Sequence, residues 1–133
     1  MTLLLDTHVW IWSQEAPDKL GRRTTRLITD LRNALYVSTA STLEIARLLK
    51  DGTIALSGSI GSWVTETLEA LSCGTIEISH PIAIGAYSLP GDFHKDPVDR
   101  LLVATARIHE MTFVTMDERI LRYAHVRSQD ARI

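Results

Sequence analysis

Leu3-Leu4-Leu5-Asp6, residues 3–6, is a short apolar run that a carboxylate ends abruptly. An apolar run of this length without alternation is typical of a strand that is buried on both faces. The segment from Thr7 to Ser13 then has the pattern of a short helix after a turn. The chain therefore opens with a strand and a helix, and an acid stands between them at the carboxyl end of the strand.

The same alternation continues along the rest of the chain. Further strands are predicted at residues 35–37, 75–78 and 112–115, and Val126 is assigned to a last short strand. Helices are predicted between the strands, over residues 19–33, 38–50, 63–72, 82–88, 96–109 and 117–123. Strands that alternate with helices predict an α/β fold, in which a central mostly parallel sheet lies between helices on both faces.

Length and composition predict one domain over residues 1–133. No apolar run reaches the roughly 18 residues that would suggest a membrane span, and the apolar start lacks a basic leader. Neither a membrane segment nor a signal peptide is therefore expected. The chain has one cysteine, Cys73, which allows no internal disulfide and fits a reducing compartment, so we expect a cytoplasmic protein.

The formal net charge of −2 bears on the class of partner. A nonspecific coat on nucleic acid would need a strong basic excess, which this chain lacks. An enzyme that brings metal ions to a phosphate needs acidic ligands, and those lower the net charge. The charge thus disfavours a histone-like binder and leaves a metallonuclease open.

Acidic residues stand at or near the ends of the predicted strands. Asp6 and Asp117 follow strands directly, Glu44 lies in the helix after the second strand, and Asp96 and Asp99 open the longest apolar helix. The carboxyl ends of strands in an open α/β sheet are where functional groups gather. If the strands are neighbours, these five carboxylates converge at one edge of the sheet.

Each acid also has a purely structural interpretation. Asp6 and Asp117 could cap helices, and Asp96 before Pro97 is well placed to do so. Glu44 completes the capping-box pattern Ser41-x-x-Glu44, and Asp96 could pair with Arg100, which we favour over a contact of Arg100 with phosphate.

The position of two acids argues against capping alone. Asp99 heads an apolar stripe on its helix, and Glu44 stands at the edge of an apolar run. A carboxylate above a core stripe is destabilised by several kcal/mol unless a cation neutralises it. Carboxylates without a cysteine and histidine cluster suit hard cations, so Mg²⁺ or Mn²⁺ is expected and zinc is not. Such ions activate water for attack on a phosphodiester.

At these residues the chain resembles the PIN-domain family, in particular the VapC-type toxins of bacterial toxin–antitoxin pairs. The matching stretches occur in the family's order across nearly the whole chain: Leu4-Leu5-Asp6-Thr7-His8-Val9-Trp10, Ser38-Thr39-Ala40-Ser41-Thr42-Leu43-Glu44-Ile45, His94-Lys95-Asp96-Pro97-Val98-Asp99-Arg100-Leu101-Leu102-Val103-Ala104 and Val114-Thr115-Met116-Asp117.

The resemblance implies a PIN-like three-layer α/β/α fold and an endoribonuclease that depends on Mg²⁺ or Mn²⁺. It places Asp6, Glu44, Asp99 and Asp117 on the family's acidic quartet, as metal ligands and catalytic residues. Supporting roles are expected for Asp96, Thr115, Thr7 and Ser38, and contacts with substrate for Arg100 and His94. It also implies an RNA substrate, a homodimer and a cognate antitoxin.

Other classes of protein fit less well. A phosphotransferase with an aspartyl nucleophile would normally have a second aspartate at position 8, where this chain has His8. A signalling receiver would need an acceptor aspartate after its central strand and a lysine at a late strand end, and neither is apparent. A catalytically silent PIN-like binding module, or another phosphate or phosphodiester hydrolase, stays as the alternative, although a silent module should have lost part of the acidic set.

Overall fold

One five-stranded sheet, whose strands all run parallel, organises the molecule, and the computed structural model describes residues 1–133. The strand order is β3-β2-β1-β4-β5. The strands are β1 (Thr2–Leu5), β2 (Ala34–Ser38), β3 (Cys73–Ile76), β4 (Thr112–Thr115) and β5 (Ser128–Asp130). The first strand is thus the central one, so the residue that follows it lies in the middle of the carboxyl edge of the sheet.

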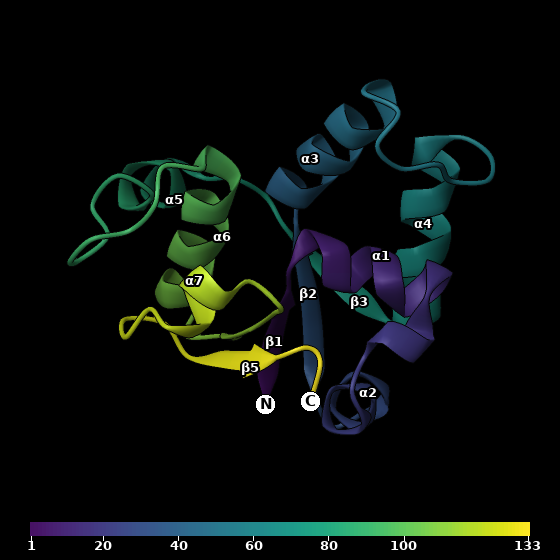
Figure 1. The fold of residues 1–133 in the computed structure, drawn as a ribbon, viewed down its shortest axis with the longest axis horizontal. Helices are drawn as coiled ribbons and strands as arrows, with labels where there is room; N and C mark the ends of the chain where they lie inside the picture. The colour runs from purple at the N-terminus through teal and green to yellow at the C-terminus, as the bar shows by residue number, and fades with distance from the viewer.

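Helices cover both faces of this sheet (Figure 1). One layer holds α1 (Thr7–Glu15), α2 (Arg22–Thr29) and α4 (Ile60–Leu71), with the short 3-10 turn Pro17–Lys19. The opposite layer holds α5 (His80–Gly85), α6 (Pro97–Ile108) and α7 (Glu118–Leu121), and α3 (Thr39–Lys50) continues from β2. The predicted three-layer α/β/α fold with a parallel sheet is confirmed.

The apolar run of β1 supplies both cores of the molecule. Successive side chains of a strand point to opposite faces of the sheet, so Leu3 and Leu5 pack with the α1 layer and Leu4 packs with the α6 layer. All three leucines are 0% exposed. On the α1 side, the rings of Trp10 and Trp63 pack 5.2 Å apart. Because β1 is buried on both faces, its residues do not alternate between apolar and polar.

The segment predicted as one helix over residues 19–33 is shorter in the structure. It contains α2 alone, which ends at Thr29, and Leu31 is 91% exposed in a turn beyond it. The C-terminal residues of the chain cross over Gly21, where a Cβ would lie 2.1 Å from the carbonyl carbon of Ile133. The interruption therefore comes from a close contact with the chain end, 112 positions further along, which no local pattern reveals.

Two strands and one helix are displaced from their predicted positions. The third strand lies at Cys73–Ile76 rather than at residues 75–78, and the last strand begins at Ser128, beyond Val126. Helix α5 begins at His80, because the Ser79 hydroxyl accepts a hydrogen bond from the Ile82 N–H and Pro81 occupies an early helical position. Separately, no helix of the structure has the length and apolar character required to cross a bilayer.

Candidate metal centre

Two of the acids are placed by the turns that follow the strands. Asp6 ends β1 and caps α1, with its Oδ1 accepting a hydrogen bond from the Thr7 N–H at 2.8 Å. Asp117 follows β4 and caps α7, with its Oδ1 accepting from the Arg119 N–H at 2.8 Å. Both acids are helix caps, as the structural interpretation expects, and the second oxygen of each carboxylate accepts a hydrogen bond from another side chain, Thr115 for Asp6 and Arg119 for Asp117.

Helix α6 presents two further acids at its start. Asp96 is its N-cap and accepts a hydrogen bond from the Asp99 N–H at 3.0 Å. Asp99 stands in the first turn, above the buried side chains of Leu102 and Val103. By capping α6, Asp96 fixes the backbone of Asp99, which stands at the start of the apolar stripe.

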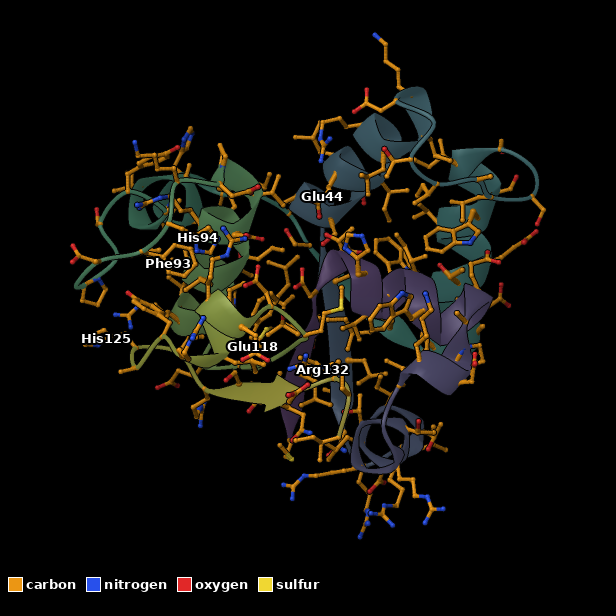
Figure 2. The ribbon with its side chains drawn as sticks, in the orientation of Figure 1. Glu44, Phe93, His94, Glu118, His125 and Arg132 are labelled. Atoms are coloured by element: carbon orange, nitrogen blue, oxygen red, sulfur yellow. The ribbon has the colours of Figure 1, made fainter.

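Glu44 extends from α3 (Figure 2) and has no capping role. The N-cap of α3 is Ser38, whose hydroxyl accepts from the Ala40 N–H at 3.0 Å. Ser41 is buried inside the helix, where its hydroxyl accepts a hydrogen bond from the Thr7 hydroxyl at 2.9 Å. The predicted capping box is therefore wrong. Thr7 and Ser38 are both buried and hold α1 and α3 in place beside the acids.

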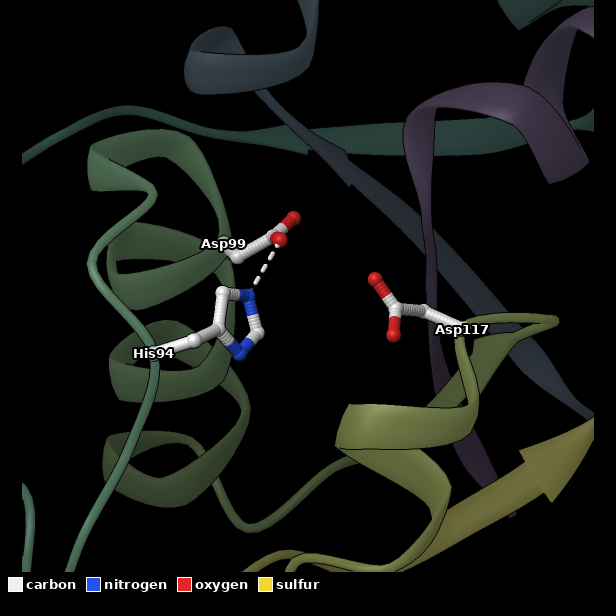
Figure 3. Close-up of side chains that lie close together, drawn as sticks. All are labelled: His94, Asp99 and Asp117. Atoms are coloured by element: carbon white, nitrogen blue, oxygen red, sulfur yellow. Dashed lines mark hydrogen bonds and ion pairs between the residues drawn. The ribbon is translucent and has the colours of Figure 1, made fainter.

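The five acids that the sequence singles out lie around one cavity of about 310 Å³ at the carboxyl edge of the sheet. Asp99 on α6 and Asp117 after β4 face each other across a gap (Figure 3). The lining residues are Asp6, His8, Glu44, Asp96, Asp99, Met116, Asp117 and Arg119. The structure thus brings together acids that are separated by as many as 111 positions in the chain. We refer to this space as the acid cavity.

Thr115 connects the first and last acids of the cavity. Its hydroxyl donates to Asp6 Oδ2 at 2.6 Å and accepts from the Asp117 N–H at 3.0 Å. Burial raises the pKa of Asp6 to about 7, and the charges of Asp99 and Glu44 act in the same direction, although the Thr115 hydrogen bond opposes them. The carboxyl group at the centre of the cavity therefore carries a proton for part of the time near neutral pH.

His94 contacts Asp99 from the loop before α6. Its Nε2 lies 2.6 Å from Asp99 Oδ2, as the dashed line in Figure 3 marks. The His94 ring stacks on Phe93 with the ring centroids 4.2 Å apart, which fixes its orientation. Burial raises the pKa of Asp99, and the hydrogen bond with His94 counteracts part of that rise. His94 thus contacts an acid of the cavity, and its predicted contact with substrate stays a prediction.

Arg119 and His8 line the cavity without having been assigned to it from the sequence. The Arg119 Nη2 lies 3.0 Å from Asp117 Oδ2 and 3.7 Å from Asp99 Oδ2. Burial alone would raise the pKa of Asp117, but its hydrogen bonds with Arg119 outweigh that effect and lower it. The one signal in the sequence is the spacing Asp117-x-Arg119, which allows a hydrogen-bonded turn.

Arg100 serves a different purpose from the predicted one. Its guanidinium donates to the backbone carbonyls of Phe93, His94 and Ala86, at 2.8, 2.9 and 3.1 Å. The favoured ion pair with Asp96 is wrong, and Arg100 does not line the acid cavity. Its predicted contact with substrate stays a prediction. Arg100 fastens the loop that carries His94 to the start of α6.

The donor set of the cavity fits a hard divalent cation. Ligand atoms of His94, Asp99 and Asp117 lie within 4.8 Å of one another, a spacing that one ion can bridge. Most of the donors are carboxylate oxygens, which hard cations prefer, and Cys73 is not among them. A cation also supplies the charge that would favour the ionised form of Asp6. The spacing of the sequence does not reveal the contact of His94 with Asp99.

The sequence profile of the PIN domain matches residues 3–126, so the chain belongs to the PIN domain family. Among its relatives is "Ribonuclease VapC22" of Mycobacterium tuberculosis, which is 34% identical over 126 residues that make up 95% of either chain.

Solved structures of low sequence identity share the fold. The structure of DNA-bound VapBC from Salmonella typhimurium includes a chain with a TM-score of 0.68 and 17% identity, and the match covers 98% of both chains. VapBC2 from Rickettsia felis, bound to a promoter DNA fragment, gives a TM-score of 0.67 at 14% identity, over 97% of this chain and 98% of that one.

Proposed function

We propose that this protein is a metal-dependent endoribonuclease that hydrolyses phosphodiester bonds in RNA. The observation that carries the proposal is the acid cavity, where Asp6, Glu44, Asp99 and Asp117 come from four separate segments of the chain. A pocket with this many carboxylates is self-repelling without bound cations. The similarity to a ribonuclease of the same length supports RNA as the substrate.

The cation is Mg²⁺ or Mn²⁺, and the side chains that would hold it are Asp6, Glu44, Asp99 and Asp117. When bound, such an ion activates a water molecule and stabilises the charge that develops on the leaving oxygen. The protein's own contribution is to keep the four carboxylates in place. Thr115 holds Asp6 by a hydrogen bond of 2.6 Å, and His94 orients Asp99 in the same way. Asp96 acts through the backbone, as the cap of α6.

The biological role that we propose is that of the toxin in a toxin–antitoxin pair, acting in the cytoplasm where RNA is present. VapBC complexes from Salmonella and Rickettsia share the fold over nearly the full chain, which supports a cognate antitoxin as the partner. We further propose a homodimer, following the family. A short reading frame for a DNA-binding protein immediately upstream of the gene would support the pairing.

The function is tested by incubating purified protein with labelled single-stranded RNA and, separately, with DNA of the same sequence. We expect cleavage of RNA in Mg²⁺ or Mn²⁺ and none in EDTA. Asp6→Asn keeps the shape of the side chain but removes its negative charge, and it should abolish cleavage. Asp18→Asn, which changes an exposed acid in the 3-10 turn, is the matched control and should cleave like the wild type.

Two results would reject the proposal. Cleavage that persists in EDTA would exclude a role for a dissociable metal. Equal cleavage by Asp6→Asn and the wild type would remove the acid cavity from the reaction, even if the protein were a nuclease.

A further inference from the structure

Arg119 belongs to a local motif that occurs three times in the chain. The tripeptide Asp-x-Arg is found at residues 30–32, 117–119 and 130–132. In each copy, the backbone N–H and the guanidinium of the arginine donate to the aspartate two positions earlier. Pairing inside the tripeptide is therefore a common turn, and by itself it indicates no function.

The central copy differs in what else its arginine reaches. Arg119 contacts Asp99 on α6 as well as Asp117, and the side chains of these acids are only 13% and 23% exposed. Arg132 also reaches a second acid, Glu118 (Figure 2), but that side chain is 57% exposed on the surface. Arg32 pairs with Asp30 alone. Arg119 is the copy whose positive charge lies between acids of the cavity.

A divalent cation would need the oxygens that Arg119 faces. An ion that coordinates a carboxylate lies roughly 2.0–2.6 Å from its oxygen, in front of the oxygen's lone pairs. The Arg119 Nη2 approaches Asp117 Oδ2 to 3.0 Å and Asp99 Oδ2 to 3.7 Å, so it occupies the approach to both. Two cations in this space would repel each other strongly. The guanidinium and the metal ion are therefore competitors.

Arg119 also lines a neighbouring cavity of about 290 Å³, together with Gly91, Asp92, Arg122, Tyr123, Ala124 and His125. The Arg119 side chain is 57% exposed, so packing does not lock it against the acids. Arg122 and His125 are exposed and can contact phosphate oxygens, whereas Asp92 is the one acid of this cavity.

We propose that Arg119 is the resident counter-cation of the acid cavity. It lies between Asp99 and Asp117 while no metal is bound, gives up this position to the divalent cation, and then contacts the RNA backbone from the neighbouring cavity. The contact with RNA rests on the function proposed above. The competition with metal requires only that the acid cavity binds a cation.

The competition is tested by titrating Mn²⁺ into the metal-free protein in a calorimeter. Removal of the competing charge in Arg119→Gln should tighten Mn²⁺ binding by roughly 2- to 30-fold, the range expected for breaking two ion pairs, with Asp99 and with Asp117. Arg119→Lys keeps a cation and should stay closer to the wild type than Arg119→Gln does. Arg32→Gln and Arg132→Gln change the matched arginines outside the cavity and should leave the affinity unchanged. Circular dichroism establishes that each variant is folded.

The contact with RNA is tested by fluorescence anisotropy with a labelled single-stranded RNA. Ca²⁺ replaces Mg²⁺, and the RNA is examined for cleavage after each titration. Loss of one phosphate contact in Arg119→Gln should weaken RNA binding by roughly 3- to 10-fold, again relative to unchanged Arg32→Gln and Arg132→Gln variants.

The outcomes separate the two proposals. Mn²⁺ affinity that is unchanged or weaker in Arg119→Gln would overturn the counter-cation role. Tighter Mn²⁺ binding with unchanged RNA affinity would overturn the phosphate contact. A wild-type protein that binds Mn²⁺ but cuts no RNA would reject the ribonuclease function, and the Mn²⁺ titration would still decide whether Arg119 competes with the ion.

Discussion

The acid cavity has two halves that stabilise their carboxylates in different ways. Asp99 and Asp117 form a paired half, in which His94 and Arg119 lie within 4.0 Å of carboxylate oxygens. Asp6 and Glu44 form an unpaired half. Asp6 has hydrogen bonds from the Thr115 hydroxyl and the Thr7 N–H but no cationic neighbour, and Glu44 has only Arg47 at 4.0 Å, the outer limit for an ion pair.

The difference shows two ways in which a fold compensates the negative charge of several carboxylates in one small space. In the paired half, the Arg119 guanidinium supplies positive charge, and its hydrogen bonds lower the pKa of Asp117. In the unpaired half, a proton takes that part, and the pKa of Asp6 rises to about 7. A bound divalent cation would replace both the proton and the arginine. Changes in the two halves should therefore affect stability differently but affect catalysis alike.

The largest expected effect is on catalysis, from one conservative change in each half. Glu44→Gln in the unpaired half and Asp99→Asn in the paired half should each lower the rate of RNA cleavage about 10³-fold, because both remove a proposed ligand of the catalytic ion. Initial rates with a labelled RNA in Mn²⁺ measure this. Glu66→Gln on the exposed side of α4 is the control and should keep the wild-type rate. Full activity in Glu44→Gln would restrict the site to the paired half.

The second effect concerns the stability of the metal-free protein as a function of pH. The Asp6 pKa is higher in the folded state, about 7, than the ordinary value of 3.8 for an unperturbed aspartate, so the folded state binds the proton more tightly. This contribution to stability is fully present below pH 3.8 and is lost as the pH rises through about 7. The loss is on the order of 3 kcal/mol. Urea unfolding in EDTA at pH 5 and pH 8 measures it.

Asp6→Asn isolates this contribution from those of other groups. The variant cannot take up the proton, so its free energy of unfolding should fall less than that of the wild type between pH 5 and pH 8. At pH 8 in EDTA it should be the more stable of the two proteins, although it is inactive. If the free energies of unfolding of wild type and variant changed with pH in parallel, the pKa of Asp6 would not be raised by its surroundings.

The third effect concerns Arg100, which supports the paired half by holding the loop that carries His94. Arg100→Met removes the donor to three backbone carbonyls, so the free energy of unfolding should fall by about 2–3 kcal/mol, measured by urea unfolding. Arg100→Lys keeps the charge but cannot match the planar geometry, and it should recover only a part. Mn²⁺ affinity should fall in both variants because the loop with His94 loosens. A stable Arg100→Met variant would contradict this assignment.

The smallest expected effect is at Asp96, and it tests whether this residue is a helix cap or a metal ligand. Asparagine caps helices as well as aspartate does, so Asp96→Asn should keep its stability and lose less than about 3-fold in cleavage rate. Asp96→Ala should lose about 1 kcal/mol of stability. Thermal unfolding and initial rates measure the two quantities. A loss of activity in Asp96→Asn as large as in Asp99→Asn would make Asp96 a ligand.

Much of the fold and the positions of the acids could be predicted because they depend on local features. The run of leucines in β1 predicts a buried strand, and the rule that functional groups gather at the carboxyl ends of strands brings Asp6 and Asp117 together. Asp99 is recognisable because its helix has an apolar stripe of helical spacing. Each of these predictions depends on only a few residues that are neighbours in the sequence.

The remaining features depend on contacts between distant segments. Helix α2 is shortened by the chain end that packs on Gly21, and the last strand is too short, at three residues, to give a pattern. The sequence pairs Arg100 with Asp96 because that acid is one helical turn away, whereas its actual partners are backbone carbonyls of the loop before α6 and of the end of α5. The reach of Arg119 to Asp99 likewise depends on how α6 and α7 are placed side by side.

The most direct test of the account is a crystal structure of the protein with Mn²⁺, with the ion located by its anomalous scattering. We expect an anomalous peak within coordination distance of carboxylates from both halves of the acid cavity, with Arg119 turned away from Asp99. A cavity without such a peak at saturating Mn²⁺, or a peak bound by residues outside the cavity, would contradict it.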